Sequence, residues 1–130
     1  MSTLKMLKKR VLFLDSDPEY LACAELGQEM EIVTEKNLGN SNSCAVSMPF
    51  LLDLIKVIFK TEFNLVILAD SNGAGLKKGW VLDMELRKKT VVVSDLGLSD
   101  IEEKEYKKLG YHLFMTRIQV ALEIRGLLGL

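Results

Sequence analysis

The chain has 130 residues, of which 48% are hydrophobic, with 17 basic and 18 acidic side chains. This length fits a single domain over residues 1–130, which can bury roughly two thirds of its unfolded surface. Basic residues are scattered, so the dense basic face that nucleic-acid binding requires is absent from the sequence. The apolar run near the N-terminus, Val11–Leu14, is far too short for a signal peptide, and Asp53 and Lys56 interrupt the most apolar stretch, Phe50–Phe59. We therefore expect a cytoplasmic protein without nucleic-acid or membrane partners.

Short apolar runs alternate along the chain with segments of helical periodicity. This alternation is typical of βαβ units built around a parallel sheet. Right-handed crossovers between successive strands then place helices on both faces of the sheet. The predicted strands are Arg10–Leu14, Met30–Thr34, Leu65–Ala69, Thr90–Val93 and Tyr111–Met115.

Helix signals fill the intervals between these strands. The predicted helices are Pro18–Leu26, Met48–Lys60, a single helix from the loop Asp70–Gly75 to about Lys88, one from Ser99 to near Gly110, and one from Thr116 to Leu128. The last two each begin with a capping box, in which the cap hydroxyl and a Glu or Gln three residues later bond reciprocally to the backbone. The polar segment Asn37–Ser47 reads as an exposed loop. We expect Trp80 to pack the third helix against the sheet, and the alternative is a position at an interface.

Polar side chains follow the predicted strands where each strand ends. Asp15 and Asp17 follow the first strand, Asp70 the third, Ser94 the fourth and Arg117 the fifth. Because the carboxyl ends of parallel strands meet at one edge of a sheet, these groups should form one site there.

With these features the chain resembles the receiver domain of two-component response regulators, over Arg10 to Leu128. The resemblance implies an α/β, three-layer α/β/α flavodoxin-like fold with a five-stranded parallel sheet in the order 2-1-3-4-5. It also implies that acidic residues after the first strand help to hold Mg²⁺. Here the family's acidic pair falls on Asp15 and Ser16, with Asp17 next. We therefore expect a weak Mg²⁺ site at Asp15 and Asp17, and the alternative is that these carboxylates are only helix caps and solvated strand ends.

Several positions depart from the family pattern. The family's phosphoacceptor aspartate falls on Ala69, and Asp70 stands one residue later. A one-residue offset in a strand turns a side chain to the opposite face, so Asp70 becomes an acceptor only if a bulge re-aims it. Ser94 matches the switch hydroxyl at the end of the fourth strand. Arg117 and Ile118 replace the family's lysine and proline after the fifth strand, and arginine and lysine differ in geometry.

We therefore expect a pseudo-receiver: not an enzyme, but a receiver-like module that binds a protein partner in a signalling pathway without conventional phosphorylation of an aspartate. The resemblance points to a homodimer through the helix from Ser99, the strand Tyr111–Met115 and the helix from Thr116. One alternative is a phosphorylatable response regulator that uses Asp70, with Mg²⁺ as cofactor. Another is a nucleotide or phosphate-ligand domain that uses the loop Gly73–Gly75, with Lys77 and Lys78 as phosphate contacts.

Overall fold

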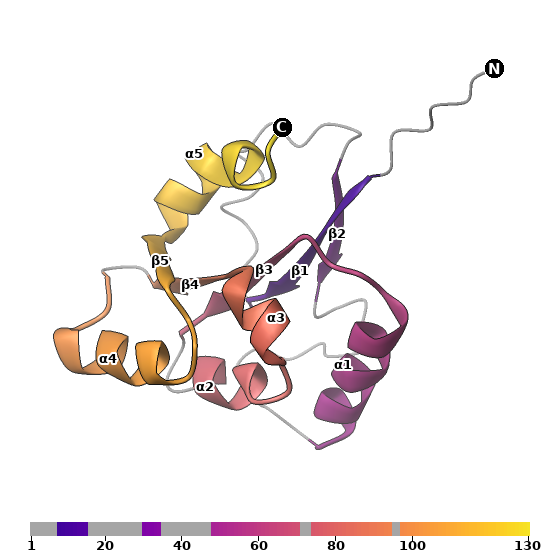
Figure 1. The fold of residues 1–130 in the computed structure, drawn as a ribbon, viewed down its shortest axis with the longest axis horizontal. Helices are drawn as coiled ribbons and strands as arrows, with labels where there is room; N and C mark the ends of the chain where they lie inside the picture. The colour runs from indigo at the N-terminus through magenta and orange to yellow at the C-terminus, as the bar shows by residue number, and fades with distance from the viewer. Residues whose placement is uncertain (1–7, 16–29, 35–47, 71–73, 95–96) are drawn as a thin grey trace.

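The computed structural model describes residues 8–15, 30–34, 48–70, 74–94 and 97–130. Within these ranges the strands form one all-parallel sheet in the order β2-β1-β3-β4-β5 (Figure 1). The expected flavodoxin-like α/β fold is confirmed. The strands are β1 (Lys9–Leu14), β2 (Met30–Thr34), β3 (Leu65–Ala69), β4 (Thr90–Ser94) and β5 (Leu113–Thr116).

The helices agree with the sequence except in the middle of the chain. They are α1 (Met48–Lys60), α2 (Ala74–Gly79), α3 (Met84–Lys88), α4 (Asp100–Lys108) and α5 (Arg117–Leu127). Both capping boxes form, from Ser99 with Glu102 and from Thr116 with Gln119. The predicted helix Pro18–Leu26 and the predicted loop Asn37–Ser47 lie outside the described residues.

The prediction of a single helix after the third strand is wrong, because the segment contains two short helices. The first ends at Gly79, and the carboxylate of Asp83 then accepts a hydrogen bond from the Leu86 amide and caps a new helix. Trp80 lies in the turn between them and is exposed, so it does not pack on the sheet as expected.

The last strand begins two residues later than predicted. Tyr111 precedes β5 as a buried packing residue, and its hydroxyl donates to the carbonyl of Gly79.

The central strands are buried on both faces, so alternate residues enter two separate cores. On β3, Val66 and Leu68 pack in the same core as Tyr106 of α4. The intervening Ile67 packs in the other core, with Val120 of α5. Figure 1 shows α5 on one side of the sheet and α1 to α4 on the other. We call these the α5 side and the α4 side.

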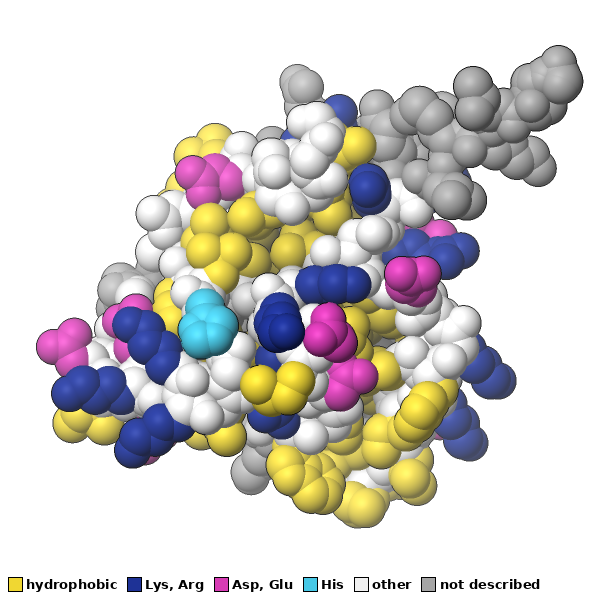
Figure 2. All heavy atoms as spheres, viewed as in Figure 1, with side chains coloured by type: hydrophobic (Ala, Val, Ile, Leu, Met, Phe, Trp, Pro, Cys, Tyr) yellow, Lys and Arg dark blue, Asp and Glu magenta, His cyan; other side chains and the backbone are white. Residues whose placement is uncertain are grey.

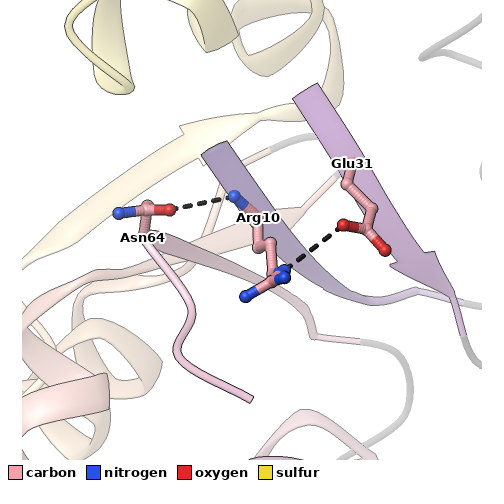
Figure 3. A network of polar contacts seen from close by, with 3 residues as sticks. All are labelled: Arg10, Glu31 and Asn64. Carbon is pink, nitrogen blue, oxygen red and sulfur yellow. Dashed lines mark hydrogen bonds and ion pairs between the residues drawn. The ribbon is translucent and has the colours of Figure 1, made fainter. Parts of the chain in front are cut away.

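Arg10 joins three neighbouring segments near the amino end of the sheet (Figure 3). Its amide donates to the side-chain oxygen of Asn64 at 2.9 Å, and its Nε donates to Glu31 at 3.2 Å. In the sheet register Arg10 lies opposite Glu31. The ion pair is exposed and contributes little free energy, so the hydrogen bonds serve mainly to align β1 with β2 and β3.

Gly75 allows α2 to approach the end of β3. A Cβ atom at this position would lie 2.5 Å from the Tyr106 hydroxyl and 2.7 Å from the backbone oxygen of Ala69. In contrast, a Cβ atom at Gly126 of α5 would have no other heavy atom within 4 Å. The two helical glycines therefore differ in their packing constraint.

We expect Gly75→Ala to lower the free energy of unfolding by about 2 kcal/mol, because the added methyl group overpacks against fixed backbone. Gly126→Ala should raise it by about 0.5 kcal/mol, since alanine is the better helix former and the site is open. Urea unfolding of both variants measures the difference. Equal effects at the two positions would contradict this packing.

Candidate functional site at the carboxyl edge of the sheet

The carboxyl ends of the strands are aligned by the sheet register. Leu14 pairs with Leu68, which places Asp15 level with Ala69, the last residue of β3. Ala69 in turn pairs with Val93, and Ser94 with Thr116. The described residues that were expected to form a site therefore do lie along one edge.

Arg117 and Asp15 form a two-point ion pair at this edge. The Nε and Nη2 atoms of Arg117 each donate to a different carboxylate oxygen of Asp15, both at 3.0 Å. The Asp15 side chain is 0% exposed and that of Arg117 only 16%. Charge-assisted bonds with this fork geometry are among the strongest side-chain contacts in proteins. The first strand is thereby tied to the first residue of α5.

The pair spans the middle of the sheet, because β3 and β4 lie between β1 and β5. Ala69 follows the alternation of Leu65 and Ile67, so its side chain is on the α5 side, where α5 begins. Its small methyl group is buried at the position where the receiver pattern has its phosphoacceptor. The arginine fork is thus paired with the carboxylate that follows β1 rather than with one on β3.

Asp70 faces the α4 side, as the one-residue offset predicts. Its Oδ1 atom accepts a hydrogen bond of 2.6 Å from the hydroxyl of Tyr106 on α4. Its amide donates to the carbonyl of Val93, which continues the pairing of β3 with β4. Asp70 and Asp15 therefore end neighbouring strands but make contacts on opposite sides of the sheet.

Tyr106 is the site residue that the sequence did not reveal. It is buried and makes edge-to-face ring contacts with Tyr111 at 5.6 Å and with Phe114 at 6.3 Å between centroids. In the sequence it is the one aromatic residue of a helix rich in Glu and Lys. That contrast indicates burial, although it does not indicate a bond to Asp70.

Burial raises the pKa of Asp70 above its ordinary value, and the nearby carboxylates of Glu102 and Glu105 act in the same direction. The hydrogen bond from Tyr106 opposes the shift. Burial and the Asp70 carboxylate together raise the pKa of the Tyr106 hydroxyl, so it remains a proton donor to Asp70. This carboxyl group is consequently a weaker acid than a free aspartate.

Ser94 lines a hollow of about 210 Å³ near the start of α5. The hollow lies between the ends of β4 and β5 and the segment that leads into α4. Its lining comprises Ser94, Gly97, Leu98, Glu103, Phe114, Met115, Thr116 and Gln119. Glu103 is the one charged side chain among these described residues.

The predicted Mg²⁺ site involves Asp17, which lies outside the described residues along with Ser16. At Asp15 both carboxylate oxygens accept hydrogen bonds from Arg117, so a cation that binds there shares these oxygens with the guanidinium or displaces it. Among the described residues no group of three or more His, Cys, Asp or Glu side chains could hold a metal ion. Weak Mg²⁺ binding stays a prediction.

The glycine-rich loop of the nucleotide alternative is described only from residue 74 onward, so Gly73 lies outside, as does the side chain of Lys77. Gly75 is explained by its close approach to Tyr106 and Ala69. Lys78, the other predicted phosphate contact, has a buried side chain. These features favour packing over ligand binding at the start of α2.

Comparison with known proteins adds no assignment: no protein-family model matches the chain, and no curated protein matches it. None of the helices in the described part of the chain has both the length and the apolar character to cross a bilayer.

We expect Arg117→Gln to destabilise the fold by about 3 kcal/mol, because it removes the ionic partner of a buried carboxylate. The double variant with Asp15→Asn should recover part of this loss, giving a coupling energy of about 2 kcal/mol. Lys88→Gln is the control: it breaks the exposed ion pair with Glu85 and should cost less than about 0.5 kcal/mol. Additive effects of the two single variants in urea unfolding would contradict the pair.

Asp70 should make the fold less stable as the pH rises. Because its pKa is higher in the folded than in the unfolded chain, its favourable contribution is complete below the ordinary value of 3.8 and is lost as the pH rises through the raised value. Asp70→Asn keeps an acceptor for Tyr106 and should be more stable than the parent protein at pH 7, with the difference shrinking towards pH 4. Thermal unfolding across this range measures the effect, and a variant less stable at pH 7 would refute it.

Proposed function

We propose that this protein is a receiver-like signalling domain that works through protein–protein contact and does not use conventional aspartate phosphorylation. The observation that carries the proposal is the ion pair at the carboxyl edge. Arg117 donates hydrogen bonds to both oxygens of the Asp15 carboxylate, and alanine occupies position 69.

The requirements of phosphoryl transfer give this observation its meaning. Transfer to a carboxylate needs a positioned nucleophile, Mg²⁺ to neutralise phosphate oxygens and a cation to stabilise developing charge. At this edge the Arg117 cation and the Asp15 carboxylate neutralise each other, and the acceptor position holds Ala69. The acceptor carboxylate is thus missing from position 69, and the Arg117 guanidinium is already paired with Asp15. The flavodoxin-like fold is nevertheless present.

The proposed partner-binding surface consists of α4, β5 and α5. Ile101, Ile118 and Leu122 are exposed large apolar residues on these helices. Figure 2 shows basic and acidic side chains mixed over α4. Apolar anchors within mixed polar surroundings suit a protein interface. The partner is a protein of a signalling pathway in the cytoplasm, and a second copy of the chain is the homodimeric form of the same proposal.

Phosphorylation of Asp70 is the second candidate. Asp70 is a carboxylate at the end of β3, which is the strand that carries the acceptor in receivers. Its bond to Tyr106 and its position on the α4 side, away from the ion pair, weigh against it.

Intact-mass measurement after incubation with Mg²⁺ and acetyl phosphate tests the proposal. We expect no phosphoryl adduct on the parent protein, because position 69 has no acceptor. Asp70→Asn is the assignment control: an adduct on the parent protein that this variant loses would establish the second candidate and overturn the pseudo-receiver. An adduct that persists in the variant would overturn both.

A further inference from the structure

Helix α1 carries large apolar side chains on a face that does not contact the core. Met48, Leu52 and Phe59 are 65%, 52% and 86% exposed, and the half-buried Ile55 lies between them in sequence. At 3.6 residues per turn these four residues fall within an arc of roughly 60°. We call them the α1 stripe. Figure 2 shows hydrophobic side chains gathered on the surface over α1.

The stripe extends well beyond the face by which α1 packs on the sheet. That packing face centres on the buried Leu54, with the partly buried Leu51, Val57 and Ile58 also packed against the α4-side core. Leu54 lies roughly 130° around the helix from the centre of the α1 stripe. A helix that only covers a sheet has a polar face towards solvent. The exposed stripe therefore indicates a second contact.

We propose that the α1 stripe binds the same stripe of a second copy of this chain, with the two helices antiparallel. The spacing of the stripe, at i, i+4, i+7 and i+11, is that of alternating d and a positions in a heptad repeat. It also reads the same in both directions. A two-fold axis near Asp53 and Leu54 therefore sets Met48 opposite Phe59 of the other copy and Leu52 opposite Ile55, so every apolar residue has a partner.

The area of the stripe sets the strength of the association. A large side chain buries on the order of 150–250 Å² when fully covered, so the exposed parts of the stripe amount to roughly 400 Å² per copy. With the flanking atoms that a crossing helix covers, the total for both copies reaches about 1,000 Å², the lower limit for a specific interface. The dimer should thus be weak and dependent on concentration.

Sedimentation velocity of the full chain up to about 1 mM tests this inference, which does not rest on the proposed function. We expect a reversible shift from monomer to dimer as concentration rises. Leu52→Lys and, separately, Phe59→Lys should abolish it, because each buries a charge in the dimer. Both sites are exposed in the monomer, so the variants should keep the parent circular dichroism spectrum and melting temperature.

Trp80→Lys is the matched control, since Trp80 is a 74% exposed apolar residue that lies outside both α1 and the proposed partner-binding surface. It should dimerise as the parent protein does. A chain that stays monomeric at the highest concentration overturns the inference. A dimer that survives Leu52→Lys also overturns it, and so does one that is lost with Trp80→Lys alone.

Discussion

The ion pair between Arg117 and Asp15 joins the first strand of the sheet to the helix that follows the last one. It buries a carboxylate completely and fixes the start of α5 over the carboxyl ends of the central strands. A buried pair is costly to break from one side and contributes less when compared with an apolar replacement. Its main effect here is therefore to specify one arrangement of charges at this edge.

The alternation of side chains along the strands determines which acidic residue meets which partner. Asp15 continues the face of Phe13 and reaches the beginning of α5, whereas Asp70 continues the face of Leu68 and reaches Tyr106. A single residue of offset thus divides two carboxylates between two sides of one sheet. The polar residues at this edge therefore form two separate contacts, one ionic and one with a phenol.

Much of the fold follows from local patterns that the sequence displays. The Met48–Lys60 helix and the Leu65–Ala69 strand match their predicted bounds, and both capping boxes form, because each depends on residues close together in the chain. The break at Trp80 was missed because Asp83 outcompetes a continuous helix by capping a new one. Asp15, Asp70 and Arg117 could each be predicted as site residues from the sequence. The pairing of Arg117 with Asp15 could not be predicted, because it depends on how far a side chain extends across the sheet, which sequence spacing does not reveal.

The central claim is that Arg117 is held by Asp15 and unavailable to a phosphoryl group. An NMR spectrum of the arginine Nε–H groups, recorded with Mg²⁺ and beryllofluoride, tests it most directly. In the parent protein we expect the Arg117 Nε–H to exchange slowly with water and therefore to give a separate resonance. In Asp15→Asn the exchange should be fast, so that this resonance is lost. Addition of the phosphoryl analogue to the parent protein should leave the resonance unchanged. A shift of that resonance on addition of beryllofluoride to the parent protein would show that the guanidinium leaves Asp15 for the ligand, and would contradict the claim.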